Sequence, residues 1–203
     1  NLPSKFLTYE FMIEDLNKFC NRLGKKHISL IGHSMGGKVA MLFSLKFPDT
    51  IKNLVVVDIA PVKYTSDEEE LIDQLLNLDL KKVNSRKDAD DALLKGIGDD
   101  NLRQFLLQNL IRSSNGYLWS LNLNTIKNNL QHLRDFSIDN FKPFEKKVLC
   151  IYGERSNYLN KKNKKIFKSF FPHTNFHLMK NAGHWLHVEN PNCFIKIIFK
   201  YLI

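Results

Sequence analysis

The sequence has no long apolar run of the kind that crosses a lipid bilayer. No stretch of the 203 residues approaches the roughly 20 consecutive apolar residues that a membrane-spanning helix needs. A charged segment followed by an apolar one, which is typical of a secretory leader, does not open the sequence either. We therefore expect a soluble protein without a membrane span.

Cysteine is also scarce, since the chain has only Cys20, Cys150 and Cys193. An odd number of cysteines without CxxC spacing argues against a disulfide framework and against a zinc site. Cys150 stands in an apolar run, which indicates a small core residue rather than a nucleophile. These features favour an intracellular protein in a reducing compartment and leave the organelle open.

Acidic residues are in the minority. The chain carries 30 Lys and Arg against 21 Asp and Glu, which gives a formal net charge of +9 and a pI near 9.4. An anionic partner is one interpretation of such a charge, and a lysine-rich solvated surface is the other. Because no nucleic-acid-binding motif accompanies the basic residues, we expect a solvated surface and no nucleic-acid partner.

The apolar residues that are present follow helix and strand spacings. They make up 43% of the chain, which is enough for a substantial core and excludes a disordered or fibrous protein. Residues 10–23 have helical spacing, and Gly24 follows as a stop signal. The apolar run 28–31 and the helical pattern 36–45 predict a strand, a tight turn and a helix. The β-branched run 54–57 predicts a strand buried on both faces.

The strand pattern stops near residue 64 and resumes near residue 148. Between these points the apolar spacing is helical, so we predict a helical insertion over residues 64–140. Its predicted helices are residues 68–80, 88–97, 101–111 and 125–133. After the insertion, the predicted strands are residues 148–152 and 176–178, and the predicted helices are residues 162–170 and 191–202.

Strands that alternate with helices predict an α/β fold with a parallel sheet and right-handed crossovers. We predict that the four strands lie side by side in chain order, because the insertion leaves the sheet after Asp58 and returns before Val148 without adding a strand. The predicted organisation is a core of residues 1–63 and 141–203, interrupted by a helical cap of residues 64–140. The first strand is expected to have an open flank.

Residues 32–36 (GHSMG) form a G-x-S-x-G element between a predicted strand and a predicted helix. Ser34 at this sharp turn should have strained backbone angles, and side chains at Gly32 and Gly36 are expected to collide. The start of the following helix directs N–H groups at the same point, so Met35 is the predicted oxyanion donor. A glycine-rich turn that only packs or holds a phosphate is the alternative, although the spacing matches neither G-x-G-x-x-G nor a P-loop.

A serine hydroxyl is a weak nucleophile until a base takes its proton, so a histidine must come from elsewhere in the chain. His184 follows the last predicted strand on an Asn-Ala-Gly turn, from which it can reach the carboxyl edge of the sheet. His187 lies three residues further on, and His33 is expected to point to the other side of the serine turn. We predict His184 as the base, with His187 as the alternative.

The acid that orients such a histidine usually follows the next-to-last strand, where this chain has Ser156 in place of an aspartate. Asp58 ends the apolar run 54–57, and a carboxylate in that place is costly to bury unless it is paired. Its position at the carboxyl end of a strand, where α/β folds bind ligands, favours a catalytic role. We predict Asp58 as the acid and leave Glu154, or a purely capping role for Asp58, as alternatives.

Several blocks of the sequence together resemble one family. The chain from about Tyr9 to its end is similar to the YbfF-like acyl esterases and the mitochondrial abhydrolase-domain proteins of the α/β-hydrolase superfamily. The resemblance implies an α/β-hydrolase fold with a helical cap, an ester or thioester substrate, and an acid after the earlier strand, which matches Asp58. The blocks that carry it are residues 31–38 (IGHSMGGK), 57–64 (VDIAPVKY), 153–158 (GERSNY) and 182–187 (AGHWLH), with Trp119 in the insertion.

The motif and the resemblance together imply a serine hydrolase. Ser34 attacks a carbonyl while His184 takes its proton, and Asp58 fixes the histidine tautomer. Water then cleaves the acyl-enzyme, so no metal or organic cofactor is needed. The resemblance also implies further strands and a second oxyanion donor upstream, and we therefore expect that the chain is truncated.

Two other functions share these residues: a carbon–carbon bond hydrolase or lyase with the same triad, and a non-catalytic binding module. In the insertion, Trp119 is predicted to line the acyl pocket, and packing within the cap is the alternative role for this side chain. The expected partner is a small acyl ester or thioester. The sequence does not predict an oligomeric state.

Overall fold

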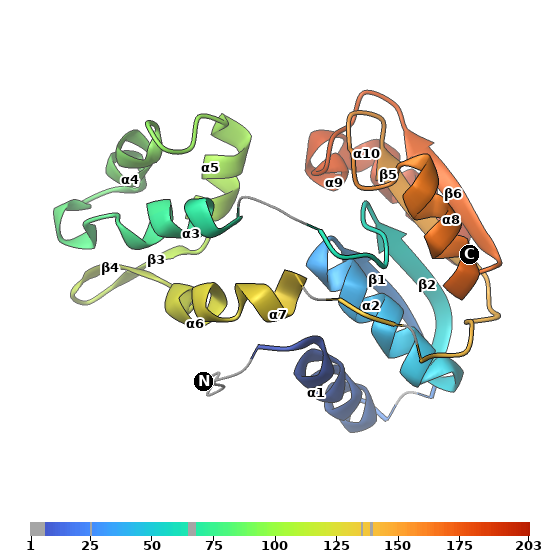
Figure 1. Cartoon of the computed structure of the whole chain (residues 1–203). Coiled ribbons are helices and arrows are strands. Elements are labelled where there is room, and N and C mark those ends of the chain that lie inside the picture. The colour runs from blue at the N-terminus through green and yellow to red at the C-terminus, as the bar shows by residue number, and fades with distance from the viewer. Residues whose placement is uncertain (1–6, 25, 65–67, 135, 139) are drawn as a thin grey trace. The chain divides into compact units, whose positions relative to one another are not determined.

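The computed structural model describes residues 7–24, 26–64, 68–134, 136–138 and 140–203. The chain divides into two compact units. The helical unit comprises residues 1–7 and 64–134, and the sheet unit comprises residues 8–63 and 135–203. Figure 1 shows the elements of each unit, which are described separately below. Within the described ranges, no helix is long and apolar enough to cross a membrane.

Parallel strands form the centre of the sheet unit, in the spatial order β1, β2, β5, β6 (Figure 1). β1 (Ile28–His33) pairs with β2 (Ile51–Val57), and β2 also pairs with β5 (Val148–Gly153). β6 (Thr174–Met179) pairs with β5. The predicted strand order and orientation are therefore confirmed, including the adjacency of two strands that the long insertion separates.

The helices of the sheet unit begin and end where the sequence has capping residues. Thr8 accepts the Phe11 N–H at the start of the first helix, and Gly24, with φ +62°, follows the end of that helix. The helical segments found in the described part of this unit are α1 (Tyr9–Arg22), α2 (Met35–Lys46), the 3-10 helix η1 (Pro48–Thr50), α8 (Lys161–Phe170), α9 (Leu186–Glu189) and α10 (Pro191–Leu202).

Helices cover both faces of the sheet at β2. Val55 and Val57 are buried in one cluster with Ile198 of α10. On the opposite face, α2 packs against β1 and β2, with Gly37 close to Val56. Both faces of β2 thus lie in the core, which explains why residues 54–57 contain no polar side chain.

β1 lies at one edge of the sheet. In the described part of the chain it pairs with β2 alone, and the side chain of Ile31 is 45% exposed. The open flank predicted for the first strand is therefore confirmed for these residues.

The helical unit has a buried cluster of its own, which includes Leu75, Leu107, Leu110 and Leu123. Its elements are α3 (Glu68–Leu76), η2 (Leu80–Lys82), α4 (Arg86–Leu93), α5 (Asp100–Leu107), β3 (Leu110–Ser113), β4 (Gly116–Trp119), α6 (Leu123–Asn128) and α7 (Leu130–Arg134).

A β-hairpin corrects the prediction of a purely helical insertion. The predicted helix 101–111 ends at Leu107, and β3 begins at Leu110. Ser113 lies opposite Gly116, so the turn residues are Ser114 and Asn115, and glycine supplies the φ of +110° at the first residue of β4. Leu110 is buried by the strand as it would be by a helix, so apolar spacing alone could not distinguish the two.

The other helices of the insertion differ from the prediction at their ends. Ser85 and Asp88 form a reciprocal capping box, so α4 starts at Arg86, two residues before the predicted start. The predicted helix 68–80 ends at Leu76, and the predicted helix 125–133 is divided between α6 and α7.

Candidate active site

The carboxyl ends of neighbouring strands carry the site. Ser34 follows β1 and Asp58 follows β2. The Ser34 N–H donates to the Val57 carbonyl at 3.0 Å, and the Asp58 N–H donates to the Ile151 carbonyl at 2.8 Å. The backbone amide of each residue is thus hydrogen-bonded to the next strand. The register of the parallel sheet therefore fixes the backbone positions of Ser34 and Asp58.

Ser34 has the strained backbone expected at the turn, with φ 52° and ψ −123°. A Cβ at Gly32 would lie 2.3 Å from the Gly36 carbonyl oxygen, so Gly32 is required as predicted. The prediction is wrong for Gly36, where a Cβ would meet nothing within 4 Å, apart from the atoms of its own helix. Gly37 is the second required glycine, because it faces β2 and its Cβ would lie 2.5 Å from Ile59 Cγ2.

The structure brings Ser34, His184 and Asp58 together. Ser34 Oγ lies 3.0 Å from His184 Nε2, and His184 Nδ1 lies 2.7 Å from Asp58 Oδ2. An ionised carboxylate only accepts, so Nδ1 carries the hydrogen and Nε2 of the neutral ring accepts from the Ser34 hydroxyl. This arrangement joins a hydroxyl, a base and an orienting acid in the order that nucleophilic catalysis requires.

Asp58 is completely buried, and its backbone has a positive φ of 52°. Besides His184, its carboxylate accepts the Gly153 N–H at 3.1 Å and the Ser156 hydroxyl at 2.5 Å. Ser156, at the place where the acid was first expected, therefore donates to the carboxylate that follows the earlier strand. This role of Ser156 was not predicted from the sequence. The signal that could have indicated it is the position of Ser156 in the loop after β5, where the acid is usual.

Glu154, the alternative acid, supports the histidine loop. Its carboxylate accepts the Asn181 N–H at 2.8 Å. Glu189 accepts the Gly183 N–H at 3.0 Å and pairs with Arg155 at 2.6 Å. Carboxylates on both sides of the loop therefore fix the backbone that carries His184.

His33 lies against His184, which corrects the prediction that it points away. His33 Nε2 donates to the His184 carbonyl at 2.9 Å, and the two ring centroids are 4.6 Å apart. Burial lowers the pKa of His33 to about 4, despite the opposing effect of this hydrogen bond. His33 is therefore neutral at pH 7.

His187 packs against the His33 ring. Its ring centroid is 4.6 Å from that of His33, and burial, followed by the nearby His184, lowers its pKa. Its Nδ1 is buried and has no hydrogen-bond partner among the described residues. The histidine that contacts Ser34 is His184.

α2 begins at Met35, directly after the serine. The Ser34 carbonyl accepts the Gly37 N–H at 2.9 Å and the Lys38 N–H at 3.2 Å, which starts the helix at the turn. The first N–H groups of a helix have no acceptor within it. The role of the Met35 N–H as an oxyanion donor remains a prediction.

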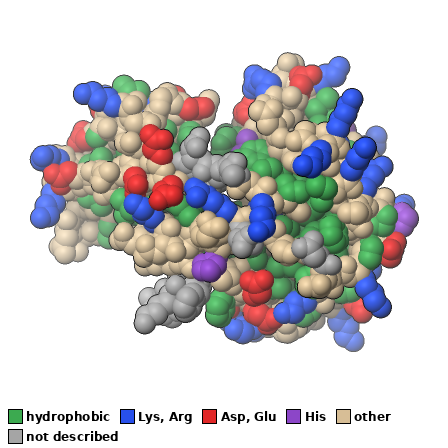
Figure 2. Space-filling view, viewed as in Figure 1, with side chains coloured by type: hydrophobic (Ala, Val, Ile, Leu, Met, Phe, Trp, Pro, Cys, Tyr) green, Lys and Arg blue, Asp and Glu red, His purple; other side chains and the backbone are tan. Residues whose placement is uncertain are grey.

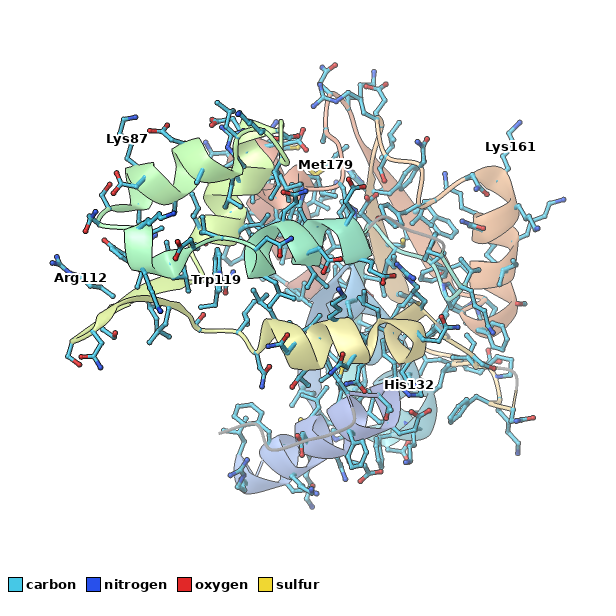
Figure 3. The ribbon with its side chains drawn as sticks, turned by 60° about the vertical axis from the view of Figure 1, so that its left-hand side comes forward. Lys87, Arg112, Trp119, His132, Lys161 and Met179 are labelled. Atoms are coloured by element: carbon cyan, nitrogen blue, oxygen red, sulfur yellow. The ribbon has the colours of Figure 1, made fainter. Side chains whose placement is uncertain are left out.

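Trp119 belongs to the helical unit, at the end of β4 (Figure 3). Its Nε1 donates to the Leu75 carbonyl at 3.2 Å, and its ring packs against the buried cluster of that unit. These contacts give Trp119 a structural role. Its predicted place in the lining of an acyl pocket remains a prediction.

Cys150 is completely buried in β5, and burial strongly raises the pKa of its thiol. It is a core residue, as predicted. Among the described residues, no group of three or more His, Cys, Asp or Glu side chains could hold a metal ion.

Lysine side chains lie on the outer face of α8. Figure 2 shows Lys and Arg side chains gathered where this helix lies, and Lys161 projects away from the sheet in Figure 3. Lys161, Lys162 and Lys165 are exposed, while Lys164 lies 3.7 Å from the centroid of the Tyr152 ring. The lysine run is therefore the solvent face of an amphipathic helix.

With this fold and this geometry, comparison with known proteins gives a clear family. Residues 3–191 match the family described as alpha/beta hydrolase fold, and the chain belongs to it. A solved structure described as a marine microorganism esterase is 33% identical, with a TM-score of 0.93, and the match covers 98% of this chain and 78% of that chain.

The relatives also confirm the expected resemblance. The sn-1-specific diacylglycerol lipase ABHD11 of Mus musculus is 34% identical over 201 residues, which cover 96% of this chain and 65% of the mouse protein. The esterase YbfF of Escherichia coli is 26% identical over 197 residues, which cover 97% of this chain and 75% of YbfF. The chain therefore spans less than two thirds of the length of the mouse relative.

Proposed function

We propose that the protein is a serine hydrolase that cleaves an acyl ester through an acyl-enzyme on Ser34. The observation that carries the proposal is the continuous chain of hydrogen bonds from Ser34 Oγ through the imidazole of His184 to the buried carboxylate of Asp58. Similarity to proteins named as esterases and a lipase supports the same reaction class.

In the first half of the reaction, Ser34 Oγ attacks the carbonyl carbon of the ester while His184 Nε2 takes the hydroxyl proton. Asp58 accepts from Nδ1 and stabilises the imidazolium that results. The tetrahedral oxyanion is held by the Met35 N–H at the positive end of α2, and one such donor contributes about 2.7 to 4 kcal/mol. His184 then protonates the leaving alcohol as the carbon–oxygen bond breaks.

In the second half, water attacks the acyl-enzyme. His184 Nε2 takes a proton from the water, and the resulting tetrahedral intermediate releases the carboxylic acid as Ser34 recovers its proton. Every proton transfer in this cycle passes through His184 Nε2, and Asp58 orients the ring without taking a proton.

The proposed substrate is an acyl ester of an alcohol, of the class named for the mouse relative. A thioester can follow the same steps, because a thiolate leaves the tetrahedral intermediate in place of an alkoxide. Hydrolysis rates for an acyl glycerol, a p-nitrophenyl ester and an acyl thioester with the same acyl chain would distinguish the two classes.

The test of the proposal is covalent labelling of the natural protein by a fluorophosphonate probe. Ser34→Ala should abolish labelling and reduce ester turnover by several orders of magnitude. Ser169→Ala, at an exposed serine of α8, is the matched control and should leave both unchanged. Labelling that survives Ser34→Ala would contradict the proposal.

The same measurement separates the alternative functions. Labelling at Ser34 without turnover of any ester or thioester would indicate a binding module that retains the triad. Turnover of a β-diketone in preference to esters would indicate a carbon–carbon bond hydrolase.

A further inference from the structure

The imidazole of His184 lies between other aromatic rings. The Tyr158 ring lies 4.4 Å away between centroids and is tilted by 30° against the imidazole. The His33 ring lies at 4.6 Å with a tilt of 42°, and Trp185 approaches at 5.4 Å with a tilt of 69°. Tyr158 is thus the ring most nearly parallel to the imidazole.

The two hydrogen bonds of His184 do not by themselves fix the plane of its ring. They attach Nδ1 to Asp58 and Nε2 to Ser34, and together with the Cβ–Cγ bond they leave only small tilts about the line that joins the two ring nitrogen atoms. A ring stacked on the face of the imidazole opposes that tilt. The Tyr158 ring therefore adds a restraint that keeps the Nε2 lone pair aimed at Ser34 Oγ.

The backbone of Tyr158 is held at both ends. Its N–H donates to Ser156 Oγ at 3.3 Å, and its carbonyl accepts from Asn163 Nδ2 at 2.8 Å. Ser156 in turn donates to Asp58. The loop that carries the Tyr158 ring is therefore anchored to the acid and to the first turn of α8.

The neighbouring rings differ in what they offer to a positive charge. His33 is neutral at pH 7, and its Nε2–H is directed at the His184 carbonyl. A phenol ring presents a negative π face to a cation. Tyr158 is consequently suited to stabilise the imidazolium that forms when His184 takes the Ser34 proton.

We infer that Tyr158 is a positioning residue of the proposed reaction, whose ring holds the His184 imidazole in plane and stabilises its protonated form. The inference rests on the proposed function. It requires the ring of Tyr158 and does not require its hydroxyl.

The test compares Tyr158→Leu with Tyr158→Phe in the natural protein. Tyr158→Leu should lower kcat for an ester by about tenfold and change KM by less than about twofold, because the stack acts on proton transfer rather than on substrate binding. The rate of fluorophosphonate labelling should fall in the same ratio. Tyr158→Phe, which keeps the ring, should restore at least half of the wild-type kcat.

Tyr152→Leu is the matched control, since it removes a tyrosine ring from β5, the strand before the Tyr158 loop, where that ring contacts Lys164. It should leave kcat unchanged. If Tyr158→Leu does not fold, as judged by its thermal melting curve, Tyr158→Met provides a second variant without a ring, with the same expected loss of kcat.

Three results would overturn the inference. They are a wild-type kcat in the variants without a ring, an effect confined to KM, and a Phe variant as slow as the Leu variant. Wild-type protein that neither labels nor turns over an ester would instead overturn the proposed function, and the inference with it.

Discussion

Single residues of the site combine burial with hydrogen bonding, and Asp58 shows this most clearly. Its side chain is 0% exposed, and its carboxylate accepts from His184, Ser156 and Gly153. A buried carboxylate without donors would cost several kcal/mol. The donors that offset this cost include the imidazole itself, so the bond that makes burial tolerable also orients His184.

Asp58→Asn should reduce ester turnover by about 10⁴-fold, the scale seen when an acid can no longer fix the histidine tautomer. An amide that donates to Nδ1 would leave the ring hydrogen on Nε2. Nε2 could then not accept the Ser34 proton. Steady-state kinetics on a folded variant measures this effect.

Glu154→Gln is the control for that variant. Its carboxylate accepts the Asn181 amide, and an amide oxygen can keep this bond, so turnover should change by less than about threefold. A large loss in Glu154→Gln together with a small one in Asp58→Asn would show that the acid is assigned to the wrong residue.

Ser156→Ala should lower kcat by about tenfold, since it removes a hydrogen bond to the buried charge of Asp58. The same variant should unfold at a lower urea concentration than the wild type. Ser169→Ala removes a hydroxyl from an exposed site and should do neither. Equal kinetics in the two serine variants would exclude a role for Ser156 in supporting the acid.

Among the elements, α2 depends on close contact with the strand and loop that follow it. Gly37→Ala should place a methyl group 2.5 Å from Ile59 Cγ2 and 3.3 Å from Val56 Cγ1, both on buried residues. Overpacking of this kind costs about 1 to 3 kcal/mol, which lowers Tm by about 2 to 4 °C per kcal/mol. Thermal unfolding measures the change.

Gly36→Ala is the matched control on the adjacent position of the same helix. A Cβ there meets nothing within 4 Å beyond its own helix, so Tm should stay within about 1 °C of the wild type or rise slightly, as alanine favours the helix. A Gly36→Ala variant less stable than Gly37→Ala would contradict the close packing of α2 at Gly37.

For the molecule as a whole, the partly buried His33 should couple stability to pH. Its pKa is lowered from 6.5 to about 4 by burial. Below pH 6.5 the unfolded chain binds a proton at this residue that the folded protein excludes, so the free energy of unfolding should fall as the pH drops from 6.5 to 4. The contribution lost in this window is about 3 kcal/mol.

Urea unfolding at pH 7 and at pH 4.5 would measure this coupling. His33→Gln should weaken the decrease in stability between the two pH values, whereas His27→Gln, at an exposed histidine, should leave it as in the wild type. An unchanged decrease in His33→Gln would mean that other groups account for the acid sensitivity.

The sequence alone determined most of the elements and the candidate residues that local patterns reveal. Its apolar runs gave the four strands, and right-handed crossovers in chain order were enough to predict their neighbours. The G-x-S-x-G turn identified Ser34, and the strand ends pointed to Asp58 and His184. Local patterns failed at several helix ends and at the hairpin of β3 and β4, whose apolar spacing also suits a helix.

Only the tertiary structure decided which distant side chains touch. Ser156 and Asp58 are 98 residues apart in the chain, and His33 and His184 are 151 apart, yet each pair is hydrogen-bonded. The stack of Tyr158 on His184 and the contact of Gly37 with Ile59 belong to the same class. Such contacts depend on strand register, loop anchoring and side-chain rotamers together, and close packing of the whole unit is what fixes all three.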